Sequence, residues 1–296
     1  MDGRAASEAV RAVVCSQRGS APRWGRAGFH DTARRGPFPV AVLPTPTIGA
    51  GFPRLLSSPV VQRPTGAARP LRWGLGDFAW AWPATVVAQV VVGAVLVVAR
   101  GTQAGHKADA IDVAAITVGS ALATLGMLAL LASARGRGSL RADFGFVVRI
   151  RDWPWLAAGA GLQVAGVAAV LVIQAISGSE PQQDVAKVLQ RASTPARLAG
   201  GLAVVIAAPL AEELLFRGLL LRALLRRFDA GAAVLLSAAG FAAVHLLDVS
   251  AAPLLAPLLL VGVVAGIRAV RTGDLSQSIM LHAGFNLLSA AVLFAT

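Results

Sequence analysis

From Phe78 onward the sequence is a succession of apolar stretches of roughly 18 to 25 residues, a pattern that restricts the possible folds more than any other feature. A helix rises 1.5 Å per residue, so about 20 apolar residues cross the hydrocarbon core of a membrane. Backbone groups in lipid have to satisfy their own hydrogen bonds, and the stretches lack the alternation of barrel strands, so each is predicted to be a helix. Seven such stretches lie at approximately 78–99, 110–134, 154–177, 196–216, 230–248, 252–270 and 275–295. We therefore expect an all-α, polytopic bundle of about seven transmembrane helices.

The composition agrees with lipid as the main solvent. Hydrophobic residues make up 56% of the chain and charged residues 14%, whereas charged residues are about a quarter of an ordinary soluble domain. The net charge of +12 indicates no nucleic-acid partner, because the Arg residues are scattered and form no basic face interleaved with aromatic residues. Cys15 is the only cysteine, which excludes intrachain disulfides and thiolate metal sites. The scarcity of Lys and the absence of Tyr indicate a GC-rich genome, so we expect a bacterial protein of the plasma membrane.

Basic residues at the ends of the predicted helices indicate an orientation. If the N-terminus is inside, the N-terminal tail and the segments 135–152, 217–228 and 268–274 all face the cytoplasm, and together they hold most of the Lys and Arg. This asymmetry is what the positive-inside rule requires. The predicted topology therefore has its N-terminus inside and its C-terminus outside.

The chain divides into three parts. Residues 1–70 are rich in Arg and Pro and have neither helical nor strand periodicity. They are predicted to be a disordered tail, or to reflect a start codon placed too far upstream. Residues 71–195 contain three transmembrane helices and a more polar segment, Glu180–Ala196, which is expected to lie along the outer interface or to form a surface loop. Residues 196–296 hold the ionisable residues of the membrane region.

These ionisable residues are few, and a charge inside a membrane helix is costly unless partners, cavity water or a function offsets it. Each of three predicted spans places two polar or aromatic residues four positions apart, on one face of a helix. The motifs are Glu212-Glu213-Leu-Leu-Phe-Arg217 in the fourth span, Phe241-Ala-Ala-Val-His245 in the fifth and His282-Ala-Gly-Phe-Asn286 in the seventh.

The two glutamates are expected to have different surroundings. Glu213 can pair with Arg217 along one face of its helix. Glu212 is turned from Glu213 by about 100° and faces another neighbour, so its carboxylate is expected to remain free. Phe241 is expected to form a wall of the pocket below His245, and His282 and Asn286 point in the same direction.

Two kinds of chemistry fit this set. A carboxylate and imidazoles in a low dielectric can activate water by general-base catalysis. Glu212, His245 and His282 could instead hold a divalent metal such as zinc with one coordination position left open. Structural interpretations compete with both, since a membrane His can simply hydrogen-bond a neighbouring helix and Glu213 with Arg217 can be a structural ion pair.

The three motifs, in this order on successive helices, resemble the CPBP family of intramembrane proteases. This family, also called Abi, includes the CAAX prenyl endopeptidases and bacterial proteins of bacteriocin processing or self-immunity. The resemblance covers roughly residues 195–295, the catalytic core of the family. It implies that Glu212 is the general base and acts on water with His245, and that His282 and Asn286 stabilise the oxyanion. Glu213 and Arg217 would order the site, Glu213 with a possible direct part, and the reaction would be of either a metallo- or a glutamate type.

The leading hypothesis is thus an intramembrane endopeptidase that cleaves membrane-associated or secreted peptides. A second hypothesis is a non-proteolytic immunity or scaffold protein that binds a toxin or partner and uses the motifs for helix packing. A transporter that relays protons or cations is a third hypothesis, but no internal repeat or pair of interrupted helices supports it.

Overall fold

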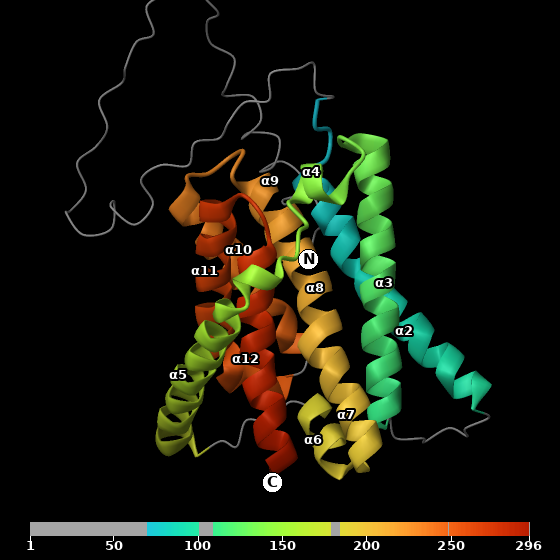
Figure 1. Ribbon diagram of the computed structural model, residues 1–296, viewed down its shortest axis with the longest axis vertical. Helices are drawn as coiled ribbons and strands as arrows, with labels where there is room; N and C mark the ends of the chain where they lie inside the picture. The colour runs from blue at the N-terminus through green and yellow to red at the C-terminus, as the bar shows by residue number, and fades with distance from the viewer. Residues whose placement is uncertain (1–69, 101–108, 179–183, 248, 296) are drawn as a thin grey trace, which may run out of the picture. The chain divides into compact units, whose positions relative to one another are not determined.

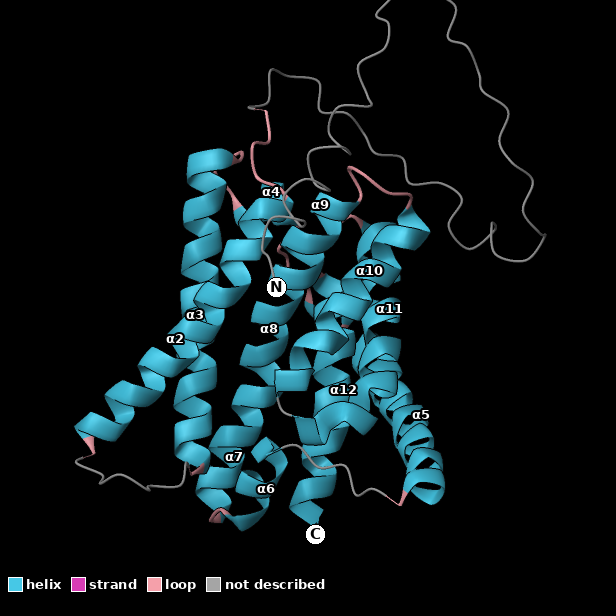
Figure 2. Cartoon of the chain, turned by 180° about the vertical axis from the view of Figure 1, so that it is seen from behind, coloured by secondary structure: helices cyan, strands magenta, loops and turns pink. Residues whose placement is uncertain are grey.

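The computed structural model describes residues 70–100, 109–178, 184–247 and 249–295. The predicted tail, residues 1–70, lies almost wholly outside these ranges, as does the start of the predicted interfacial segment. The described residues form helices and no strands (Figures 1 and 2). Six of the helical stretches are long and apolar enough to cross a membrane. The prediction of an all-α, polytopic membrane bundle is therefore confirmed, and its orientation stays a prediction.

The long helices lie where the apolar stretches predict them. Short helices α4 (Leu140–Phe144), η2 (Ile150–Asp152) and α6 (Asp184–Arg191) connect them. The long stretches are α2 (Leu75–Ala99), α3 (Ala110–Arg135), α5 (Pro154–Ser177), a fourth helix over Thr194–Leu224, α10 (Ala230–Ala243) continued by the 3₁₀ turn η5 (Val244–Leu247), α11 (Leu255–Thr272) preceded by the 3₁₀ segment η6 (Val249–Leu254), and α12 (Ser276–Ala295). All of these except α12 are among the six candidate spans.

The fourth helix is longer than predicted. It consists of α7 (Thr194–Leu202), η3 (Ala203–Ala207), α8 (Ala208–Glu213), η4 (Leu214–Leu221) and α9 (Arg222–Leu224). The prediction ended it at approximately residue 216 and counted Arg217 with the cytoplasmic segment 217–228, although it also expected Arg217 to pair with Glu213 on the same helix. Arg217 is instead 1% exposed and paired with Glu213, so the helix continues past it. The predicted boundary was wrong for that reason.

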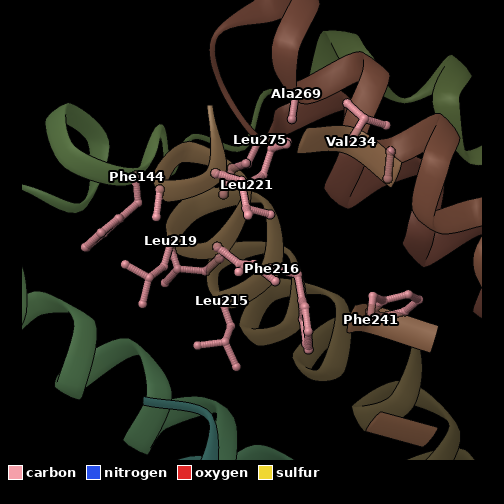
Figure 3. Packing of buried hydrophobic residues seen from close by; sticks show 14 of the residues in the cluster. Phe144, Leu215, Phe216, Leu219, Leu221, Val234, Phe241, Ala269 and Leu275 are labelled. Atoms are coloured by element: carbon pink, nitrogen blue, oxygen red, sulfur yellow. The ribbon is translucent and has the colours of Figure 1, made fainter. Parts of the chain in front are cut away.

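The fourth helix is also the central one. Half of its most apolar 18-residue window is buried in protein, compared with 6% for α2 and 11% for α5. Its residues Leu215, Phe216 and Leu219 point outward from the helix into the hydrophobic core (Figure 3). The other helices therefore surround the segment that carries the two glutamates.

Glycines let two pairs of helices approach closely. A Cβ on Gly159 of α5 would lie 1.9 Å from the Leu281 carbonyl oxygen of α12, and a Cβ on Gly284 of α12 would lie 2.0 Å from the Leu156 carbonyl oxygen of α5. In α11, a Cβ on Gly262 would lie 3.0 Å from the Cβ of Ala238 in α10. Small residues give membrane helices this backbone contact, and it fixes α12, with its two site residues, against α5 (Figure 1).

Gly159→Ala is accordingly expected to separate α5 from α12 and to lower the unfolding free energy by about 1–3 kcal/mol, the usual cost of overpacking. Gly161→Ala, on the same helix, is the matched control, because a Cβ at residue 161 would meet nothing within 4 Å. Thermal unfolding in detergent measures both. Equal melting temperatures for the two variants would contradict the close contact.

The start of α3 is fixed by its N-cap. The Asp109 carboxylate accepts hydrogen bonds from the backbone N–H groups of Ile111 and Asp112, at 2.8 and 2.9 Å. It also pairs with Arg100 at 2.9 Å. The Asp112 backbone hydrogen bond, followed by the effect of Arg100, lowers the pKa of Asp109 below its usual value. Asp109 therefore stays ionised near neutral pH and ties the ends of α2 and α3 together.

Candidate active site

The two glutamates lie at the end of α8, between two π-helical segments, η3 and η4. π-helical turns are rare and are often found at functional sites. The side chain of Glu213 is fully buried, whereas that of Glu212 is 33% exposed. The two adjacent carboxylates thus differ in accessibility, as their angular separation on the helix predicts.

Glu213 is held by two basic side chains. Its Oε1 atom accepts a hydrogen bond from Nη1 of Arg217 at 2.9 Å and another from Nδ1 of His282, also at 2.9 Å. Arg217 reaches further, donating from Nη2 to the Gly262 carbonyl at 3.2 Å and lying 4.5 Å above the centre of the Phe241 ring. The Glu213 carboxylate therefore joins the fourth helix to α12, and Arg217 joins it to α10 and α11.

This buried ion pair is incompletely satisfied. Oε2 of Glu213 and Nε of Arg217 are both buried and have no hydrogen-bond partner in the described part of the chain. Burying charges costs several kcal/mol per ion, roughly, unless geometry and further hydrogen bonds offset it. An arrangement of this kind is a poor way to gain stability, which favours a role in the site.

His282 lies between the two carboxylates. Its Nδ1 atom must carry a proton, because it donates to the Glu213 carboxylate. Its Nε2 atom is 3.6 Å from Oε2 of Glu212, in charge-pair range and beyond hydrogen-bond distance. The imidazole is buried, and its edge packs on Phe241 with 5.3 Å between ring centres. One face of the site is therefore formed by α12.

His245 lies in the 3₁₀ turn η5, directly after α10. Its Nδ1 atom is 2.9 Å from the Phe241 carbonyl oxygen, one helical turn earlier. A carbonyl can only accept, so Nδ1 carries the proton and the Nε2 atom of the neutral imidazole keeps its lone pair. The His245 ring is half-buried and packs on Phe241 with 5.1 Å between ring centres. Phe241 thus contacts both histidines, Phe216 and Arg217.

Asn286 makes a different contact from the one that its position on the His282 face suggests. Its Nδ2 atom donates to the Val204 carbonyl in η3 at 2.9 Å. Both residues of the His282-xxx-Asn286 motif therefore reach the fourth helix, His282 at Glu213 and Asn286 at the π-helical segment before it.

The proposed metal ligands do not form a ligand cluster. Among the described residues, no three His, Cys, Asp or Glu side chains are arranged so that they could hold a metal ion. Glu212, His245 and His282 do not fit a zinc site in this arrangement, in which Nε2 of His282 lies 3.6 Å from Oε2 of Glu212.

One site residue was missed in the sequence. Ser237 of α10 is fully buried, and its hydroxyl donates to the Phe216 carbonyl in η4 at 3.0 Å. Its position was a usable signal, because Ser237 is four residues before Phe241 and eight before His245 in an otherwise apolar helix. Pro209, three residues before Glu212, also has a role that only the three-dimensional structure shows.

Residues 194–288 match the family model described as type II CAAX prenyl endopeptidase Rce1-like. No curated protein and no solved structure matches the chain. The matched range extends from the start of the fourth helix through most of α12 and includes every site residue described above. The resemblance of the three motifs to the CAAX protease, or CPBP, family is thereby confirmed over residues 194–288.

Proposed function

We propose that this protein is an intramembrane endopeptidase that hydrolyses peptide bonds of membrane-associated or secreted peptides, with Glu212 as the general base. The family match supports a CAAX-type endopeptidase in general. The observation that carries the assignment to Glu212 is its contrast with Glu213. Glu213 is fully buried and bonded to two basic groups, while Glu212 is one-third exposed and 3.6 Å from His282.

In the proposed reaction, water lies against Glu212 and attacks the carbonyl carbon of the substrate. Glu212 takes a proton from that water as the C–O bond forms, and returns it to the leaving amine nitrogen as the C–N bond breaks. The lone pair on Nε2 of His245 accepts a hydrogen bond from the water and helps to orient it. Phe241 supports this imidazole from below.

The negative charge that develops on the substrate oxygen needs a donor. We propose Nε2 of His282 for this role, because Nδ1 of the same ring donates to Glu213 and leaves Nε2 to face the substrate; Nε2 donates there when both ring nitrogens carry protons. The resemblance gives Asn286 a share in this task, and because its amide has two N–H donors, the bond to Val204 uses only one of them. Arg217 holds Glu213 in place and stays away from the substrate.

The reaction is proposed to need no metal, since no three His, Cys, Asp or Glu side chains of the described residues are arranged to hold one. Purified protein is expected to contain less than about 0.1 zinc per chain and to lose less than about half of its activity in 1,10-phenanthroline or EDTA, because no Lewis acid is used. Elemental analysis and peptide cleavage assays measure the two quantities. Stoichiometric zinc, with activity lost on chelation and restored by added metal, would contradict the glutamate mechanism.

The function itself is tested by comparing membranes that contain the active protein with membranes that contain the Glu212→Gln variant. New peptide termini are expected with the active protein alone, and N-terminal proteomics detects them. Two fluorescence-quenched probes, a farnesylated CAAX peptide and an unprenylated apolar peptide, then separate the two substrate classes. Identical termini in both membranes, with neither probe cleaved, would favour the non-proteolytic hypothesis.

A further inference from the structure

The direction of the Glu212 side chain depends on the register of the helix before it. In an α-helix each N–H donates to the carbonyl four residues earlier, and in a π-helix it donates five residues earlier. The segment η3 (Ala203–Ala207) has the π register, and α8 with both glutamates follows it directly. A change of register in η3 therefore rotates Glu212 relative to the helices around it.

Pro209 leaves one hydrogen bond of this π register without its backbone donor. The Ala208 N–H donates to the Ala203 carbonyl, five residues earlier. In the same register the next donor, residue 209, would serve the Val204 carbonyl, but proline has no N–H. A carbonyl without a donor is costly inside a membrane helix, where no bulk water replaces the lost bond.

Asn286 supplies the missing donor. Its Nδ2 atom lies 2.9 Å from the Val204 carbonyl oxygen. Asn286 follows His282 by four residues on α12, and Nδ1 of His282 binds Glu213 at 2.9 Å. One face of α12 is therefore hydrogen-bonded to the fourth helix at two residues, Val204 before Glu212 and Glu213 after it.

The second π-helical segment is held in a similar way. The Ser237 hydroxyl of α10 donates to the Phe216 carbonyl within η4 (Leu214–Leu221) at 3.0 Å. Each π segment next to the glutamates is thus bonded through a carbonyl to a side chain from another helix. Of these two helices, α12 contains His282, and α10 continues into the 3₁₀ turn that contains His245.

We propose that Asn286 is a positioning residue: the N–H that it donates to Val204 holds the π turn that Pro209 makes necessary and thereby sets the direction of the Glu212 carboxylate. This inference rests on the proposed function for the catalytic role of Glu212. The hydrogen bond from Asn286 to Val204 and the missing N–H of Pro209 are independent of that role.

A double-mutant cycle between Pro209 and Asn286 tests the proposal. Asn286→Leu keeps the side-chain size and removes the donor, while Pro209→Ala restores a backbone N–H that can serve the Val204 carbonyl. In full-length protein in detergent, Asn286→Leu is expected to lower both the melting temperature and kcat, with KM changed less than about twofold, since it acts through Glu212. In the Pro209→Ala background both losses from Asn286→Leu are expected to fall to less than about half, because the two changes share one carbonyl.

Pro83→Ala is the matched control, because Pro83 also lies inside a membrane helix, α2. Its combination with Asn286→Leu is expected to be additive. Equal thermal losses from Asn286→Leu in the Pro209 and Pro209→Ala backgrounds would overturn the proposal. A kcat loss that persists undiminished with Pro209→Ala would assign Asn286 to the oxyanion and overturn it as well. If neither peptide probe is cleaved, the proposed function fails, and the thermal cycle still decides the coupling of Asn286 to Pro209.

Discussion

Glu212→Gln is expected to reduce peptide-bond cleavage by about 10²–10⁴-fold, the usual contribution of a general base. Glutamine has the size of glutamate and can neither accept the proton of the attacking water nor return it to the leaving amine. Melting temperature is expected to stay nearly unchanged, because Glu212 is one-third exposed and lies 3.6 Å from Nε2 of His282, beyond hydrogen-bond distance. Cleavage of the two quenched peptides, measured beside thermal unfolding, tests both statements.

Glu213→Gln is the matched comparison, since it makes the same chemical change one residue further along the helix. That variant leaves Arg217 buried without its carboxylate partner, so its loss of activity is expected to come with a lower melting temperature. If Glu212→Gln retains more than about a tenth of the wild-type rate, Glu212 is not the general base. Retention of the full biological effect by both Glu212→Gln and His245→Ala would overturn the enzyme hypothesis.

Much of the fold was predictable from the sequence because membrane helices have to be both long and apolar. α3 and α5 begin at the predicted residues, and α12 begins one residue after its predicted start. The end of the fourth helix was predicted wrongly, although the expected pair of Glu213 and Arg217, four residues apart on one helix, already required the helix to continue past residue 216. A buried ion pair at positions i and i+4 is compatible with continuation of the helix.

The difference between the two glutamates was also predictable, since it follows from the 100° step of a helix. The contact of Glu213 with Arg217, four residues away, is local, and the structure contains it at 2.9 Å. The contact of Glu213 with His282 spans 69 residues and depends on how α12 lies against the fourth helix. Periodicity indicates which residues share a face and does not indicate which partner that face meets.

The π-helical segments could not be predicted from the sequence, for a related reason. Pro209 signals a missing backbone donor, but a helix can respond to proline by kinking, by ending or by changing register. The register found here requires a donor from another helix, Asn286, at the Val204 carbonyl. Tertiary packing decides between a kink, a helix end and a change of register, and the sequence of the fourth helix alone does not predict that packing.

Arg217→Met is expected to destabilise the folded protein by about 3–5 kcal/mol, the usual cost of removing one partner from a buried ion pair. Methionine retains much of the apolar volume, so the loss comes mainly from the charge and its hydrogen bonds. Arg217 is 1% exposed and donates to both Glu213 and the Gly262 carbonyl. After the substitution, Glu213 keeps only His282 of its two hydrogen-bonded partners. Thermal or denaturant unfolding in detergent measures the change.

The double variant Glu213→Gln with Arg217→Met separates charge from packing. Because it removes both charges, it is expected to recover most of the stability lost in Arg217→Met, as replacements of whole buried ion pairs commonly do. Activity is expected to stay low, since the carboxylate that accepts the hydrogen bond from Nδ1 of His282 is lost. If the double variant is as unstable as the single one, the pair is required for packing. If it is stable and inactive, Glu213 and Arg217 serve the site, in agreement with the two atoms of this pair that are buried without a partner in the described region.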